Sequence, residues 1–287
     1  MAGEKLQVEK LGPKEWKFKI PSLPKKLDDS FDRGIDLMGG ENTREAEKIF
    51  RTVIKASPSH IDARHHLAML LYDRGEILPA LRTWVKAVDI GIRAFPREFS
   101  LGEDRLEWGW IENRPFLRAY QGLGCILFDV GEFDAAQRIF NNLLAMNPND
   151  NQGIRGLAIK AAFAIGSPGE VLKICKAYKS DCMVDTLYGR ALVLFQLGEK
   201  AQARKALNDA IKLSPQVARE LLKKRHTLPK GISSDYVTMG GNDEAYYYWR
   251  DQGKFWKETQ GALEFCREVL SQHREKTPTA KILPFRR

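Results

Sequence analysis

Residues 117–150 read LRAYQGLGCILFDVGEFDAAQRIFNNLLAMNPND and contain two amphipathic patterns separated by a short turn at 130–132. Apolar residues recur at spacings of three and four on both sides of this turn, as they do in helices with one buried face. Pro148 ends the second pattern, because the residue before a proline avoids the α region. The stretch therefore predicts a pair of helices that pack against each other.

The same pattern recurs along the chain with a period of about 34 residues, which is typical of a helical repeat array. The prolines that fall at position 32 of a frame are Pro58, Pro148 and Pro215. The resulting frames are 27–60, 61–90, 117–150, 151–183 and 184–217. We therefore expect five helix hairpins within residues 27–217.

Fixed positions of each frame carry residues of a fixed size. Position 8 holds Gly34, Ala68, Gly124, Ala158 and Ala191. Position 20 holds Ala46, Ala80, Ala136, Glu170 and Ala203, and position 24 holds Phe50, Trp84, Phe140, Ile174 and Leu207. Small residues let two helices approach closely, and the bulky residue then fills the space between neighbouring hairpins.

Small residues at positions 8 and 20, a bulky residue at 24 and a proline at 32 resemble the tetratricopeptide repeat (TPR) family. The resemblance implies an all-α fold, a right-handed α-solenoid of about five TPR-like hairpins. Frame 151–183 departs from the pattern at Glu170 and has Ser167-Pro168-Gly169 between its helices, so an irregular hairpin is expected there.

The frames leave an insertion of about 22 residues within 91–116, after the second hairpin. It is rich in aromatic and acidic residues, and its centre, which includes Trp108 and Trp110, alternates like a short strand or extended arm. A long loop in a compact array is usually packed down by its own side chains or functional. The insertion is thus either an arm folded onto the scaffold or an arm that gates the concave groove.

Three segments flank the array. Residues 1–26 are interpreted as a basic, flexible N-terminal segment, 218–272 as C-terminal capping helices and 273–287 as a basic tail. A series that includes Leu221-Leu222, Pro229, Tyr248 and Gly261-Ala262-Leu263 also resembles, at scattered positions, the suppressor of tumorigenicity 7 family. That resemblance implies no mechanism.

The formal net charge of +9 is not spread along the repeats. Residues 1–26, 219–230 and 271–287 each carry a net +4, so the remainder of the chain is −3. A nucleic-acid groove is expected to be basic along the array, with stacking aromatic residues between the charges. Nucleic acid is therefore disfavoured as a partner. An alternative function is binding of nucleic acid or an acidic surface through the basic termini.

The TPR resemblance implies that the first helix of each hairpin lines a concave groove for a peptide or partner protein. The groove residues assigned on that basis are His65, Tyr72, Arg118, Gln121, Phe128, Gln152, Arg155, Tyr188 and Phe195. The arginines and glutamines are donors suited to a carboxylate or peptide backbone. The alternative is that Arg118 and Arg155 pair with acids of the chain such as Glu112 or Asp150. The carboxylate clamp for chaperone tails is absent, because its first positions hold Phe31 and Ile35.

Patterns that indicate enzymes, metals or membranes are not found in the sequence. No phosphate-binding loop, nucleophile elbow or paired metal ligand has its required setting, so no catalytic, cofactor or metal residue is assigned. The apolar stretches are shorter than a membrane span, and no secretory signal is visible. A non-enzymatic, cytoplasmic scaffold for protein binding is therefore expected. The sequence does not indicate the partner's identity or an oligomeric state.

Overall fold

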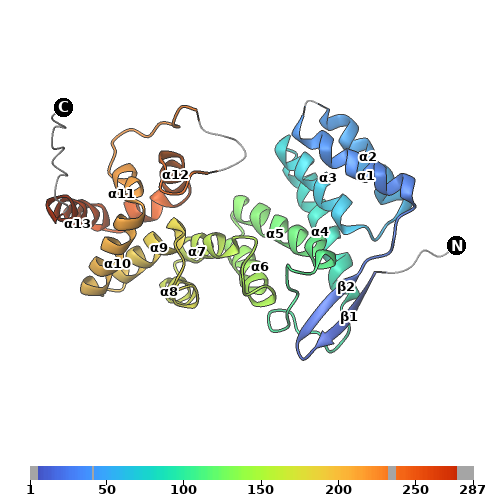
Figure 1. Cartoon of the computed structure of the whole chain (residues 1–287), viewed down its shortest axis with the longest axis horizontal. Helices are drawn as coiled ribbons and strands as arrows, with labels where there is room; N and C mark the ends of the chain where they lie inside the picture. Colours follow the sequence, from blue (N-terminus) through green and yellow to red (C-terminus); the bar gives the residue numbers. More distant parts are fainter. Residues whose placement is uncertain (1–5, 41, 232–236, 277–287) are drawn as a thin grey trace, which may run out of the picture. The chain divides into compact units, whose positions relative to one another are not determined.

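The computed structural model of the 287-residue chain describes residues 6–40, 42–231 and 237–276. It contains helices arranged in consecutive pairs, as the repeat frames predict, and one small β-hairpin (Figure 1). The chain divides into two compact units, unit 1 from Met1 to Leu157 and unit 2 from Ala158 to Arg287.

Unit 1 contains three helix pairs. They are α1 (Lys25–Asp36) with α2 (Thr43–Ala56), α3 (Ile61–Asp73) with α4 (Ile77–Ala94), and α5 (Arg114–Asp129) with α6 (Phe133–Met146). Two 3₁₀ turns, η1 (Leu37–Gly39) and η2 (Ile111–Asn113), follow α1 and precede α5. Helix α3 contacts α2, α4 and α5, so consecutive pairs stack on one another.

The glycines at position 8 lie where the two helices of a pair approach most closely. A Cβ atom added to Gly34 would lie 2.9 Å from Cε1 of Phe50, and one added to Gly124 would lie 2.6 Å from Cε1 of Phe140. Both phenylalanines occupy position 24 and are almost completely buried. The small residue and the aromatic residue therefore pack against each other directly, which explains why their sizes are paired in the sequence.

The turn between two paired helices depends on a glycine with positive φ. Gly75 (φ 76°) joins α3 to α4 and Gly131 (φ 89°) joins α5 to α6, and both fall at position 15 of their frames. Glycine adopts this left-handed conformation without the steric cost of a Cβ atom.

The N-terminal segment differs from the expectation of a flexible region, because residues 7–19 form an antiparallel hairpin. Its strands are β1 (Gln7–Gly12) and β2 (Glu15–Lys19). Trp16 and Phe18, which alternate with lysines along β2, are 2% and 1% exposed. This alternation is a strand signal in the sequence, and the burial of two large aromatic side chains explains why the segment is ordered.

The insertion at 91–116 packs against this hairpin. The indole N–H of Trp16 donates to Asp104 over 3.0 Å, and the backbone N–H of Arg105 donates to the carbonyl of Lys14 over 2.7 Å. The side chain of Asn113, which is fully buried, accepts a 2.9 Å hydrogen bond from the backbone N–H of Phe18. A two-stranded hairpin is marginal alone, so the insertion and the hairpin stabilise each other.

Unit 2 continues the helix pairs. It contains the larger part of α7 (Ile154–Ala164), then α8 (Pro168–Ala177), α9 (Val184–Gln196), α10 (Lys200–Leu213) and α11 (Pro215–Leu221). Helices α7 and α8 are short, with 11 and 10 residues. Gly166 (φ 66°) joins them, and Pro168 begins α8. Proline is favoured at the first helical position.

Two further helices, α12 (Asn242–Glu258) and α13 (Ala262–Lys276), follow the repeats. Helix α12 contacts α9 and α11, and α13 contacts α10 and α11. Trp256 of α12 is fully buried and donates from its indole N–H to the hydroxyl of Tyr248 over 2.9 Å. The aromatic residues of 246–265 therefore serve, at least in part, to attach these helices to the last repeat.

Candidate peptide-binding site

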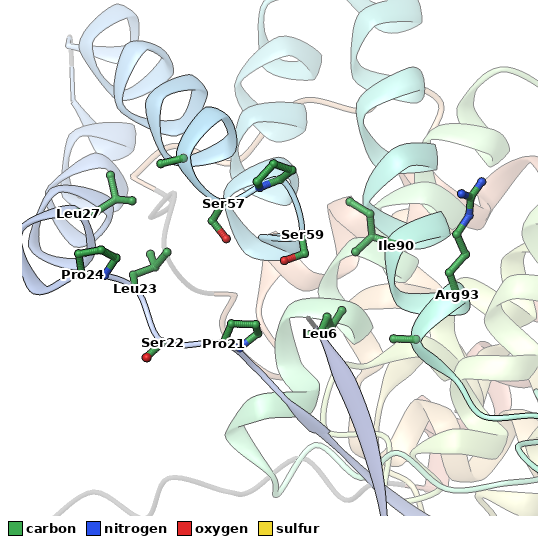
Figure 2. Close-up of a pocket in the computed structure, with 13 residues that line it drawn as sticks. Leu6, Pro21, Ser22, Leu23, Pro24, Leu27, Ser57, Ser59, Ile90 and Arg93 are labelled. Carbon is green, nitrogen blue, oxygen red and sulfur yellow. The ribbon is translucent and has the colours of Figure 1, made fainter. Parts of the chain in front are cut away.

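Two adjoining pockets lie in unit 1 at the edge where the first helices of the pairs begin. We call the larger one the apolar pocket. It has a volume of about 620 Å³. The lining residues are Leu6, Pro21, Ser22, Leu23, Pro24, Leu27, Ala56, Ser57, Pro58, Ser59, Ile90, Arg93 and Ala94. Figure 2 shows Leu23, Pro24 and Leu27 on one side of the turn at Ser57 and Ser59, with Ile90 and Arg93 on the other.

The walls of the apolar pocket come from segments that the sequence places far apart. The chain after β2 is proline-rich and cannot form a helix before Lys25, so it runs past the end of α4 as an extended segment. Arg93 is the charged residue of the lining, and its guanidinium already pairs with Asp89 at 2.9 Å. The pocket is therefore suited to aliphatic or proline side chains.

We call the smaller pocket the acidic pocket. It has a volume of about 180 Å³ and is lined by Leu6, Phe18, Ile20, Asp28, Phe31, Asp32, Ser59–Asp62, Glu112, Pro115 and Phe116. Leu6 and Ser59 line both pockets, so the two adjoin. Each helical wall is the first helix of a pair, α1, α3 or α5, together with the turn before it.

The predicted arginine donors of the groove are used within the fold. Arg118 donates from Nη2 to Asp62 over 2.6 Å, and Arg155 donates from Nη1 to Asp150 over 2.8 Å. The Arg155 side chain is 19% exposed and Asp150 is completely buried. The alternative of internal pairing is therefore the observed one for both arginines, with Asp62 as the partner of Arg118 in place of Glu112 or the acids of the insertion. Both guanidiniums are therefore engaged in ion pairs within the fold.

The other polar groove residues of unit 1 also contact one another. Gln152 donates to the side-chain oxygen of Gln121 over 2.8 Å, and the hydroxyl of Tyr72 donates to Asp129 over 2.5 Å. This hydrogen bond, with burial, raises the pKa of Tyr72 to about 12. Phe128 contacts the ring of Phe133 at 4.9 Å. These side chains are half-buried and form the remaining part of the predicted groove in unit 1.

His65 is a core residue, and its assignment to the groove surface is wrong. Its side chain is 7% exposed, and its Nδ1 accepts a hydrogen bond from the indole N–H of Trp84 over 3.2 Å. Burial lowers the pKa of His65 to about 3. The imidazole of His65 is therefore neutral and packs in the core against Trp84.

Tyr188 is buried by helices of its own unit, and the half-buried Phe195 contacts one of them, so their assignment to an open groove is corrected. Tyr188 is 0% exposed, donates its hydroxyl to the carbonyl of Ser214 over 2.7 Å, and contacts the ring of Trp256. Phe195 stacks on Phe265 of α13 with centroids 4.7 Å apart. The face of α9 that the repeat pattern assigns to a partner is occupied by the chain itself.

The two tryptophans proposed as a gating arm lie against basic side chains. The guanidinium of Arg114 lies 5.1 Å from the ring of Trp108, and the ammonium of Lys17 lies 4.9 Å from the ring of Trp110. Together with the hydrogen bonds between the insertion and the hairpin, these contacts correspond to an arm folded onto the scaffold.

The sequence patterns did not identify the residues that line the two pockets, except that Phe31, Pro58 and Glu112 were considered in other roles. Asp28 and Asp32 lie four residues apart, so they share one face of α1, and this signal was available. Leu6, Phe18 and Ile20 line the pockets because the β-hairpin places them there, and the repeat pattern does not predict this hairpin.

Within the described ranges, no three or more His, Cys, Asp or Glu side chains form a group that could hold a metal ion. Among the helices described, none combines the length and apolar character needed to cross a bilayer.

The stacked helix pairs, with small and bulky residues in register at their crossings, have the fold of tetratricopeptide repeat proteins. A crystal structure of MamA is similar, at 15% identity over 72% of this chain and 100% of that chain, with a TM-score of 0.51. PilF of Pseudomonas aeruginosa is similar at 16% identity over 85% of this chain and 98% of that chain, also with a TM-score of 0.51. These similarities show the fold.

Residues 41–260 match the family model described as transcriptional repressor TCF25. Since the match covers more than half of the sequence, the chain belongs to this family. The matched region extends from the start of the second helix to the end of α12. It therefore includes the segment 218–260, part of which resembles the suppressor of tumorigenicity 7 family. No curated protein matches the chain.

Proposed function

We propose that the chain is a non-enzymatic scaffold that holds an extended segment of a partner protein in unit 1. The observation that carries this proposal is the pair of adjoining pockets at the edge of α1, α3 and α5. Short apolar and polar pockets side by side suit alternating side chains of one extended peptide. The segment would lie across Leu6 and Ser59, which the pockets share.

The binding surface is smaller than the array. In unit 2 the face of α9 is covered by α12 and α13, as Tyr188 and Phe195 show. We therefore assign the partner to unit 1, with Tyr72, Gln121 and Gln152 as a second line of polar contacts beyond the pockets. The Arg118 and Arg155 pairs shape this surface.

The family description names transcriptional repression. On this proposal, the chain contributes to such a role by holding a partner protein. The pockets are lined by apolar and acidic side chains, which do not suit the phosphates of nucleic acid. The alternative of binding through the basic termini concerns residues 1–26 and 271–287, of which 1–5 and 277–287 lie outside the described residues.

The proposal is tested by selecting peptides from a displayed random library on the purified full-length protein. Ile90→Glu places a charge in the wall of the apolar pocket and is expected to weaken the selected peptides about tenfold or more, which is ~1.4 kcal/mol. Ile92→Glu is the matched control, because Ile92 is 37% exposed on the same helix and does not line the pocket. Helicity is checked by circular dichroism. Failure to select any peptide, or equal loss in the two variants, would overturn the proposal.

A further inference from the structure

The acidic pocket has an aromatic interior. Phe18, Phe31 and Phe116 line it and are between 0% and 7% exposed, so their rings form its floor. Phe18 and Phe116 contact each other with ring centroids 5.4 Å apart. The rings come from β2, α1 and α5, and the stacked pairs hold them rigidly. Aromatic faces attract cations as well as apolar groups, and the attraction is stronger when water is excluded.

The pocket has four carboxylates in its lining, two of which have cationic partners. Asp62 pairs with Arg118 at 2.6 Å, and Glu112 lies 4.0 Å from the ammonium of Lys17. Asp28 and Asp32 are both exposed and make no ion pair with any residue that the structure describes.

His60 is the other titratable group in the lining. Its Nδ1 accepts a hydrogen bond from the backbone N–H of Ala63, and burial lowers its pKa. It is therefore neutral near pH 7 and does not offset the carboxylates. The pocket is locally negative although the chain as a whole is positive.

Helix dipoles explain only part of this negative charge. Asp28 lies in the first turn of α1 and Asp62 in the first turn of α3, where a carboxylate stabilises a helix. Asp32 lies beyond the first turn, so the dipole gives no reason for its position. Asp62 is already engaged, because Arg118 donates to its Oδ2 and Nδ1 of His66 lies 3.7 Å from its Oδ1. The carboxylates left for a ligand are therefore those of Asp28 and Asp32.

We propose that the acidic pocket binds an arginine side chain of the partner segment, with the neighbouring apolar residues of that segment in the apolar pocket. This inference rests on the proposed scaffold function. A guanidinium carries five donors in a planar fork, so it can serve several carboxylates while one face lies on an aromatic ring. A lysine ammonium, being compact and strongly hydrated, matches this arrangement less well.

The probe for the pocket is N-acetyl-arginine amide, with N-acetyl-citrulline amide as its neutral isostere. Binding is followed by the methyl resonances of Ile20 and Ile61, which line the acidic pocket, and of Ile90, which lines the apolar pocket. The arginine compound is expected to shift the first two and to leave the third unchanged. The citrulline compound is expected to shift none of them.

The double variant Asp28→Asn/Asp32→Asn is expected to weaken the arginine probe about tenfold or more. The matched control is Asp29→Asn/Asp36→Asn, which removes the same charge from exposed positions of α1 outside the pocket. Circular dichroism verifies folding of both proteins. Equal shifts by citrulline, or equal weakening in the two double variants, would overturn the inference.

The library selection separates this inference from the scaffold function. Selected peptides are expected to contain an arginine next to apolar residues and to lose affinity when that arginine is replaced by citrulline. Peptides that depend on Ile90 but show no arginine preference would leave the scaffold function standing and remove the arginine site.

Discussion

Arg118 of α5 and Asp62 of α3 form an ion pair of 2.6 Å that connects the first helices of two consecutive hairpins. The Asp62 side chain is 12% exposed and the Arg118 side chain 34% exposed, so the pair is partly shielded from water. Asp62 lines the acidic pocket, so the pair also fixes one wall of that pocket, and Arg118, one of the predicted donors of the groove, contributes to the shape of the site.

We expect Arg118→Gln to lower the free energy of unfolding by about 1–2 kcal/mol, because it leaves Asp62 without its charged partner. Urea denaturation measures the change. The control is Arg93→Gln, since the pair of Arg93 with Asp89 is exposed and such pairs contribute about 0–1 kcal/mol. Equal losses in the two variants would show that the Arg118 pair is no stronger than a surface pair.

Gly91 of α4 approaches the ring of Phe116 so closely that an added Cβ atom would lie 2.2 Å from Cδ2. Gly91→Ala is therefore expected to destabilise unit 1 by about 1–3 kcal/mol, because Phe116 is fully buried and cannot move freely. Gly39→Ala is the control, since no atom lies within 4 Å of its added Cβ. Thermal denaturation compares the two, and an unchanged melting temperature for Gly91→Ala would contradict the packing described.

Burial raises the pKa of Asp185 from 3.8 to about 6, while a hydrogen bond donated by Gln252 acts in the opposite direction. The folded state thus binds the proton more tightly than the unfolded state. The contribution of Asp185 to stability is therefore lost as the pH rises from 3.8 through about 6. Asp185→Asn keeps the acceptor for Gln252 and is expected to raise stability by roughly 1–3 kcal/mol above that range.

Denaturation of wild-type and Asp185→Asn proteins across this pH range checks the prediction. The two curves are expected to converge at the acid end and to separate as the pH rises. Parallel curves would show that Asp185 is solvated in the folded state.

The shifted pKa of His65 makes stability depend on pH in the opposite direction from that of Asp185. Its pKa is lowered by burial from 6.5 to about 3, so the folded state excludes a proton that the unfolded state binds. Its contribution to stability is complete above pH 6.5 and is lost as the pH falls toward 3. His65→Gln is expected to be less stable near neutrality and to show a shallower loss between about pH 6.5 and 5, before most carboxylates titrate. An identical slope in both proteins would contradict the prediction.

The repeat architecture could be predicted from the sequence because its signals are local. The pairing of Gly124 with Phe140 follows from two positions within one hairpin, and the glycine turn at Gly131 follows from one. The pockets could not be predicted in this way, since their walls join residues far apart in the chain, such as Leu6 with Ser59.

The errors at His65, Tyr188 and Phe195 have a common physical cause. A repeat pattern assigns a side chain to the inner face of its helix, but it does not indicate what else of the chain covers that face. For Tyr188 and Phe195 the covering elements are α12 and α13, and for His65 it is the indole of Trp84 in its own hairpin.

The attachment of α12 and α13 to α9 and α10 has a consequence for how the array can evolve. Repeat proteins commonly lengthen by duplication of one hairpin. A hairpin added directly after α10 would need the surface that Trp256 and Phe265 already occupy. Duplication at that point would expose both rings. Lengthening of this protein is therefore favoured within the array, upstream of the helices that close it.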